Sequence, residues 1–293
     1  MWRLPGLVAV LCVAAARVQG WQPTGAQLVN AGRFEEALKA FQTDLASDPK
    51  SVAANNGAAV ALDLMGRYAE ARAYFSAAIK DAHAPLERAL AERAMVVGYG
   101  FAGDCGNAGK LERRPFQFYV ETNDFPNAGD VADELARICL DAGDLDRAAE
   151  WYQRGHDTGM QEPKIPPARS DLWDFRLAHA KGRIAARRGK PTDARKQITK
   201  AHEILDRGRI PDQEPFLPYL EGYVAFYAHE YPTALGELKR ASESDPFIEC
   251  LLAQTRAIEF YRKAAATRAH SVAAAYAQPF ARKKLASWNA GGL

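Results

Sequence analysis

Gly32-Arg33-Phe34-Glu35-Glu36-Ala37, followed by Phe41, recurs 34 residues later as Gly66-Arg67-Tyr68-Ala69-Glu70-Ala71, followed by Phe75. A fixed period of this length is typical of helical repeat arrays, in which each unit buries its apolar face against the next. Such an array presents an extended binding surface rather than an enclosed active site. The repeat therefore predicts that the protein binds another chain, although it does not identify the partner.

The sequence around the repeat predicts helices. Apolar residues recur at spacings of three and four, and runs of β-branched residues are absent. Short turns separate the helical patterns, and each contains a glycine that can end a helix in the left-handed conformation. These turn glycines are Gly32, Gly66, Gly143 and Gly189. We therefore expect an all-α protein.

The chain resembles the tetratricopeptide repeat family over residues 21–246. In the first two units the residues that carry the resemblance are Trp21, Gly25, Leu28, Phe34, Ala37, Phe41 and Pro49, then Ala59, Leu62, Tyr68, Ala71, Phe75 and Ala78. Later units match less fully, through Ala136, Leu145, Ala148 and Tyr152, then Gly182, Ala194 and Ala201, then Gly222, Tyr231, Ala234, Leu238, Ala241 and Pro246. The resemblance implies a right-handed α-α superhelical solenoid of about six irregular helix pairs.

Spacing departs from the family after the second unit. We expect one degenerate pair over residues 86–102 and 105–120, with a connector at residues 124–128. Proline-rich connectors are expected at residues 161–167 and 210–215, because proline cannot continue a helix.

The C-terminal part departs further. Residues 247–267 predict one long helix without a glycine turn. Residues 271–287 predict a closing cap with a polar outer face, followed by a tail at residues 288–293. An amphipathic helix on a membrane surface is the alternative interpretation of the cap.

The N-terminus predicts export. A short basic start and an apolar run from Leu4 to Ala16 precede Val18-Gln19-Gly20, so residues 1–20 resemble a secretory signal cut before Trp21. An uncleaved anchor is the alternative, but about 13 apolar residues are short against the roughly 20 needed to span a bilayer. We expect residues 21–287 to form the repeat domain of a periplasmic or secreted protein, with no membrane span after cleavage.

Charge and cysteine content add two expectations. Removal of residues 1–20 takes away Arg3 and Arg17 and no acidic residue, which leaves equal numbers of basic and acidic residues. This balance gives no argument for a nucleic-acid partner. Cys105, Cys139 and Cys250 are an odd, sparse set, so we expect buried small hydrophobes rather than a disulfide framework.

Motifs for catalysis are absent from the sequence. It contains no glycine-rich phosphate loop, no Gly-x-Ser-x-Gly elbow and no Cys-x-x-Cys. His202-Glu203 and His229-Glu230 begin like a zinc protease motif, but the second histidine is missing from both. We therefore expect a protein that is not an enzyme and that has no catalytic residue, metal or cofactor.

Charge is unevenly distributed along the chain. Eleven acidic residues and three arginines lie between Tyr119 and Pro163, whereas nine basic residues and three aspartates lie between Asp171 and Ala201. Adjacent units with electrostatic fields of opposite sign would orient a charged ligand. Solvated faces and ion pairs between units are the other interpretation, which we favour.

Helical geometry predicts a concave binding face. In proteins that resemble this one, peptides lie along the first helix of each pair. Residues one after and three before the small packing residue turn toward that side. The resulting candidates for partner binding are Asn56, Asp133, Arg137, His179, Arg183, Tyr219 and Tyr223. We expect folding to tolerate the loss of Arg183 and Tyr223.

One aromatic stripe lies on the first helix of the sixth unit. Phe216, Tyr219, Tyr223, Phe226 and Tyr227 recur at helical spacing. Such stripes more often belong to the core than to a ligand site.

The predicted function is a scaffold that binds a protein or peptide in its concave groove. A permanent subunit of an envelope or secretion assembly and an accessory module that delivers substrate to a separate enzyme stay as alternatives, and the oligomeric state is open.

Overall fold

The computed structural model describes residues 23–241, 245–266 and 272–289. Fourteen α-helices and one short 3-10 helix (η1) make up the regular structure of these residues. They are α1 Gly25–Asn30, α2 Phe34–Ser47, α3 Val52–Leu64, α4 Tyr68–Asp81, α5 Pro85–Phe101, α6 Cys105–Glu121, α7 Phe125–Asp141, α8 Leu145–Gly159, α9 Pro167–Arg187, α10 Pro191–Leu205, η1 Pro211–Gln213, α11 Phe216–Tyr227, α12 Tyr231–Leu238, α13 Pro246–Ala265 and α14 Val272–Asn289.

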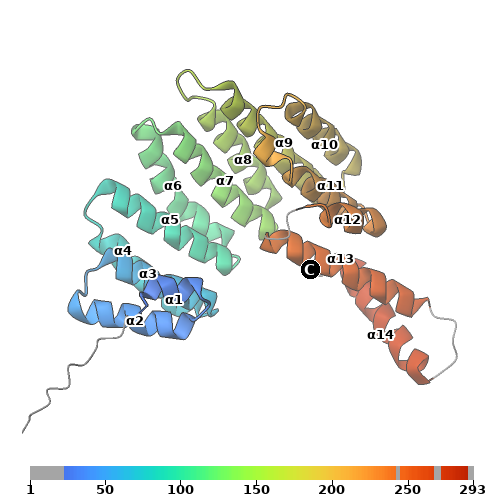
Figure 1. Ribbon diagram of the computed structural model, residues 1–293, viewed down its shortest axis with the longest axis horizontal. Coiled ribbons are helices and arrows are strands. Elements are labelled where there is room, and N and C mark those ends of the chain that lie inside the picture. The colour runs from blue at the N-terminus through green and yellow to red at the C-terminus, as the bar shows by residue number, and fades with distance from the viewer. Residues whose placement is uncertain (1–22, 242–244, 267–271, 290–293) are drawn as a thin grey trace, which may run out of the picture.

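Consecutive helices pair and stack into a curved array (Figure 1). The predicted all-α solenoid is confirmed, and α13 with α14 adds a seventh pair after the six expected from the repeats. The four predicted turn glycines have positive φ, from +67° at Gly189 to +88° at Gly143. Left-handed backbone is costly for residues with a side chain, so these glycines set the ends of their helices.

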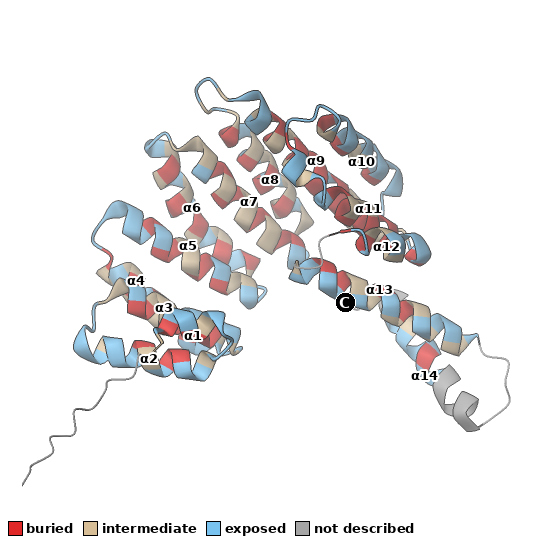
Figure 2. Cartoon of the chain, viewed as in Figure 1, coloured by how far each residue is buried: buried red, intermediate tan, exposed pale blue. Residues whose placement is uncertain are grey.

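Small residues let neighbouring helices approach closely, as the repeat pattern predicts. A Cβ atom added to Gly25 would lie 2.6 Å from the Phe41 ring, and one added to Gly222 would lie 2.6 Å from Leu238. Buried residues follow the seams between helices from one end of the array to the other (Figure 2). Each unit therefore depends on its neighbours for its core.

The helix boundaries confirm two predicted connectors and correct a third. Segment 160–166 separates α8 from α9, and η1 lies in the segment before α11. Residues 124–128, in contrast, are no connector, because α7 begins at Phe125. The Asp124 side chain accepts a hydrogen bond from the Asn127 backbone N–H, and Pro126 lies in the first turn, where a helix tolerates proline.

The predicted long C-terminal helix is α13, and residues 267–271 lie outside the described part of the chain. The expected cap falls in α14. There Ala281 is buried and Leu285 packs against the core, while Arg282, Lys283 and Lys284 are exposed.

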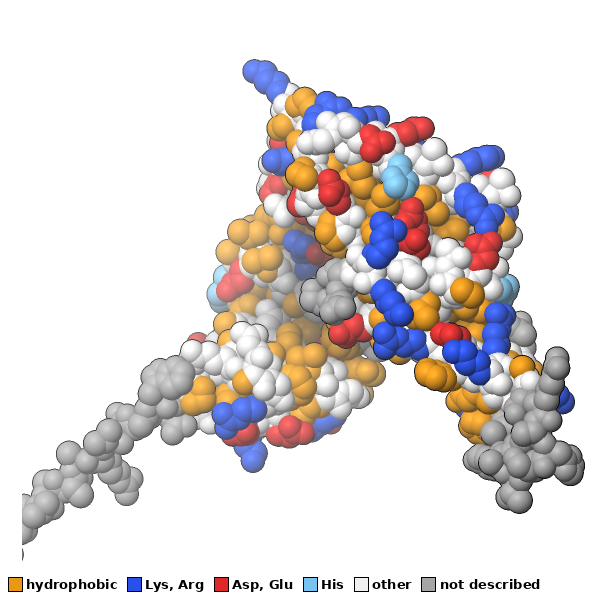
Figure 3. Space-filling view, turned by 45° about the vertical axis from the view of Figure 1, so that its right-hand side comes forward, with side chains coloured by type: hydrophobic (Ala, Val, Ile, Leu, Met, Phe, Trp, Pro, Cys, Tyr) orange, Lys and Arg blue, Asp and Glu red, His pale blue; other side chains and the backbone are white. Residues whose placement is uncertain are grey.

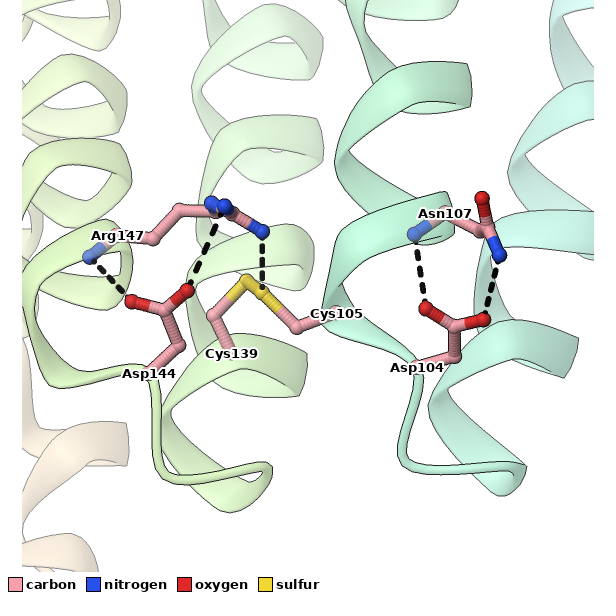
Figure 4. Close-up of a disulfide and its surroundings, with 6 residues drawn as sticks. All are labelled: Asp104, Cys105, Asn107, Cys139, Asp144 and Arg147. Carbon is pink, nitrogen blue, oxygen red and sulfur yellow. Dashed lines mark hydrogen bonds and ion pairs between the residues drawn. A yellow bond between two sulfur atoms is a disulfide. The ribbon is translucent and has the colours of Figure 1, made fainter.

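The cysteine expectation is wrong on two points. Cys105, at the start of α6, and Cys139, near the end of α7, form a disulfide with a Cα–Cα distance of 4.9 Å (Figure 4). The guanidinium of Arg147 lies 3.3 Å from the Cys105 sulfur. Cys250 is a free thiol and is exposed rather than buried. Only the burial of Cys105 and Cys139 agrees with the sequence-based expectation.

Ion pairs between units account for part of the uneven charge distribution. Arg176 of the basic helix α9 lies 2.6 Å from Asp130 of the acidic helix α7, and Arg188 contacts Asp146 of α8. This finding supports the interpretation of the charges as contacts between neighbouring units.

Candidate functional site: a cavity on the concave face

The concave face contains a cavity of about 1100 Å³. Its walls come mainly from the first helices of successive pairs, α5, α7, α9 and α11, together with Tyr152 of α8 and the start of α13. Figure 3 shows this side of the molecule hollowed between the N-terminal units and the rest of the chain, with hydrophobic side chains along the hollow. The repeat geometry thus collects side chains that are distant in the sequence around one space.

Five of the seven predicted binding residues line this cavity. They are Asp133 and Arg137 of α7, His179 and Arg183 of α9, and Tyr219 of α11. Each lies on the face of a first helix that the repeat register assigned to the concave side. Whether these residues contact a partner stays a prediction.

The other two predicted residues lie elsewhere. Tyr223 belongs to the core, where it is 7% exposed and packs between the rings of Tyr219 and Tyr227. Asn56 lies half-buried on α3, outside the cavity lining. The structure therefore corrects the expectation that Tyr223 faces the groove. The core interpretation of the aromatic stripe is correct for Tyr219, Tyr223 and Phe226, whereas Phe216 is partly exposed at the cavity.

Three of the four arginines in the cavity wall have carboxylate partners. The Nε of Arg93 donates a hydrogen bond of 3.2 Å to Glu134. Arg176 lies 2.6 Å from Asp130, and Arg137 lies 3.0 Å from Asp141. These pairs neutralise much of the charge on the wall.

Arg183 differs from the other three arginines. It is 5% exposed, and its Nη2 donates a hydrogen bond of 3.0 Å to the hydroxyl of Tyr152. Its Nε and Nη1 atoms are buried without a hydrogen-bond partner, and no carboxylate among the described residues forms an ion pair with it. A buried cation without an ion-pair partner can bind an anion through its remaining donors.

Two further titratable groups lie in the same wall. Burial, together with the nearby Asp130, raises the pKa of Asp133 to about 7, although Arg176 and Arg183 oppose the shift. Burial, with help from the charge of Arg183, lowers the pKa of His179 well below its ordinary value. His179 is therefore neutral at pH 7, and Asp133 is partly protonated.

Apolar side chains form the rim of the cavity. Val97 and Phe101 of α5 are 46% and 47% exposed. Phe216 and Phe247 are also exposed at the cavity, and the Arg137 guanidinium lies over the Phe247 ring, 3.6 Å from its centroid. The sequence analysis did not select Val97 or Phe101. Their signal was present, because Leu86, Leu90, Val97 and Phe101 recur at helical spacing along one stripe that is separate from the buried Ala89 and Val96.

The described residues offer little support for other kinds of site. They contain no cluster of three His, Cys, Asp or Glu side chains that could hold a metal ion. Likewise, none of the described helices is both long and apolar enough to cross a membrane.

Comparison with protein families supports the repeat assignment. The tetratricopeptide repeat model matches residues 27–93 and 116–163. The match supports the resemblance of this chain to tetratricopeptide repeat proteins. The matched segments extend from α1 into α5 and from α6 into the segment after α8, so they include part of the cavity wall. Comparison with curated proteins gives no match.

Two solved structures that match the chain are distant from it in sequence. The Cut9–Hcn1 hetero-tetramer of the APC/C matches with a TM-score of 0.44 and 13% identity over 79% of this chain and 41% of that chain. Naa15/Naa10 bound to HypK-THB matches with a TM-score of 0.29 and 16% identity over 85% of this chain and 42% of that chain. The chain thus spans about two fifths of the length of each.

Proposed function

We propose that this protein is a scaffold that binds a segment of a partner protein in the cavity on its concave face. The observation that carries the proposal is the exposed apolar rim, above all Val97 and Phe101, beside a polar floor. Apolar side chains gathered around a concave space are typical of interaction sites, because their burial by a partner removes them from water.

The size of the cavity fits a short segment. A helix about 10 Å across with a rise of about 1.5 Å per residue occupies roughly 120 Å³ per residue. A space of about 1100 Å³ then matches roughly nine helical residues. A small ligand would leave part of the apolar rim in water, so we favour a peptide segment.

Affinity purification with a groove variant tests this proposal. We expect Val97→Asp combined with Phe101→Asp to lose the specific partner, since two carboxylates at the rim would be desolvated on binding. Phe260→Asp is the matched control, because Phe260 is 67% exposed on α13 and does not line the cavity. Both variants should keep the wild-type circular dichroism spectrum. An identical set of partners for the groove variant and the wild type would refute groove binding.

The same purification separates the two alternative roles. A permanent subunit of an assembly would co-purify in fixed stoichiometry and resist high salt. An accessory module would release its partner readily, because transient recognition relies on weaker contacts.

We also propose that the protein is exported to the periplasm or secreted. The leader-like residues 1–20 support this location, and so does the Cys105–Cys139 disulfide. Disulfides persist in oxidising compartments and are rare in the reducing cytosol.

A further inference from the structure

We infer that the groove selects a partner segment with an acidic side chain, whose carboxylate binds Arg183 while adjacent apolar side chains cover Val97 and Phe101. This inference rests on the proposed groove binding, because it names the chemistry of the segment that the groove takes.

The distribution of charge around the cavity supports this assignment. Arg93, Arg137 and Arg176 each have a carboxylate partner within the protein, whereas Arg183 forms no ion pair with the described residues and donates its hydrogen bond to the Tyr152 hydroxyl. Burial without a counter-ion is unfavourable for a charged group. An incoming carboxylate would satisfy a guanidinium nitrogen that has no partner in the unliganded protein.

The acidic residues near Arg183 would repel such a carboxylate only weakly. Asp141 accepts a hydrogen bond from Arg137, which shares its charge. Asp133 forms no ion pair with the described residues and is partly protonated at neutral pH, so its repulsion of an arriving anion is reduced. A neutral Asp133 can also donate a hydrogen bond to a carboxylate oxygen.

A carboxylate suits this site better than a phosphate group. Recognition of phosphate groups typically uses a cluster of arginines, because the group carries close to two negative charges. Among the described residues of the wall, one arginine, Arg183, is without an ion-pair partner, and Asp133 and Asp141 line the same cavity. One free cation matches the single charge of an aspartate or glutamate side chain.

The apolar half of the site lies on α5. Val97 and Phe101 extend into the same cavity that Arg183 lines from α9, so a bound segment would contact both. The carboxylate would set the register of the segment, and the apolar contacts would supply most of its affinity.

A selection of random 12-residue peptides displayed against the full-length protein provides probes. Peptides are retained only if Val97→Asp with Phe101→Asp abolishes their binding. We expect the retained peptides to combine aspartate or glutamate with large apolar residues. Replacing the acidic residue of a selected peptide by its amide should weaken binding to the wild-type protein at least about tenfold.

Two protein variants assign this effect to Arg183. In Arg183→Met the acid and amide forms of a peptide should bind equally, to within about twofold. Arg176→Met is the matched control. Arg176 lies on the same helix and in the same cavity but already pairs with Asp130, so this variant should keep the tenfold preference.

The outcomes separate this inference from the proposed function. If no peptide depends on Val97 and Phe101, groove binding itself fails. If peptides depend on the rim but show no preference for the acid, or if Arg183→Met keeps the preference, only the assignment to Arg183 is overturned.

Should Arg183→Met fail to fold, the wild-type protein decides the question. A photoreactive diazirine side chain at the position next to the acidic residue, which is kept, should then crosslink within α9. Crosslinks confined to other helices would overturn the assignment.

Discussion

Glu112 is fully buried in α6, and neither of its carboxylate oxygens has a hydrogen-bond partner among the described residues. Burial, with contributions from Glu134 and Glu92, raises its pKa to about 9 from an ordinary value of 4.5. The side chain is therefore protonated at neutral pH in the folded protein, whereas it is ionised in the unfolded chain.

This difference predicts a stability that falls as pH rises. The folded state holds one proton more than the unfolded state between about pH 4.5 and 9. The free energy of unfolding should thus decrease by up to about 1.4 kcal/mol per pH unit in this window, and the contribution of Glu112 is fully present below it. Glu112→Gln should remove the share of this slope that Glu112 contributes, which leaves the share of Asp133 below about pH 7. Urea unfolding at pH 5.5, 7 and 8.5 measures it, and equal slopes in variant and wild type would contradict the assignment.

Ala71 provides a test of packing at the level of one residue. It is completely buried in α4, where the second copy of the repeat requires a small side chain. Ala71→Leu should lower the free energy of unfolding by about 1–3 kcal/mol through overpacking. Ala73→Leu on the exposed face of α4 is the control and should change it by less than about 0.5 kcal/mol. Equal urea midpoints for the two variants would disprove the packing role of Ala71.

The side chains that face the cavity could be predicted from the sequence for α7 and α9, but only partly for α11. The rule that placed Asp133, Arg137, His179 and Arg183 around the cavity uses one contact face per helix. Helix α11 contacts α9, α10, α12 and α13, so side chains on several faces are covered. For this reason Tyr219 and Tyr223 both pack into the core, and of the two only Tyr219 also lines the cavity.

At the scale of elements, the glycine turns and the 34-residue period predict most helices, since both are local signals. The start of α7 was missed although Asp124 and Pro126 form a helix start that the sequence also encodes. The disulfide could not be predicted in the same way. It depends on the register between α6 and α7, which brings Cys105 and Cys139 together only after the two pairs stack.

The disulfide between α6 and α7 should contribute substantially to the stability of the protein. It closes a loop with a sequence separation of 34 residues, for which chain-entropy arguments give about 3–4 kcal/mol. We expect the double variant Cys105→Ala, Cys139→Ala to unfold at lower urea concentration than the oxidised wild type. With dithiothreitol present, the two proteins should unfold almost together. A wild-type midpoint that does not respond to reduction would contradict this expectation.

At the scale of the whole molecule, the C-terminal pair returns toward the concave face. Asp245 and Phe247, at the start of α13, complete the cavity wall that α5, α7, α9 and α11 begin. Repeat patterns describe contacts between adjacent units, so they contain no signal for this approach between α7 and α13. The cavity is thus a property of the complete array rather than of any single pair.

Export, cleavage and oxidation together give a prediction for the whole chain. If the leader is removed before Trp21, Cys12 is lost, Cys105 and Cys139 are paired, and Cys250 is the single cysteine left to react. Protein isolated from its source should therefore begin at or near Trp21. Alkylation under denaturing, non-reducing conditions should add one label, and alkylation after reduction should add three. Intact mass spectrometry measures both numbers. Two labels before reduction would show that Cys12 and hence the leader are retained, and four would mean that the chain also lacks the disulfide. A full-length protein with four free thiols would place it in a reducing compartment and refute export.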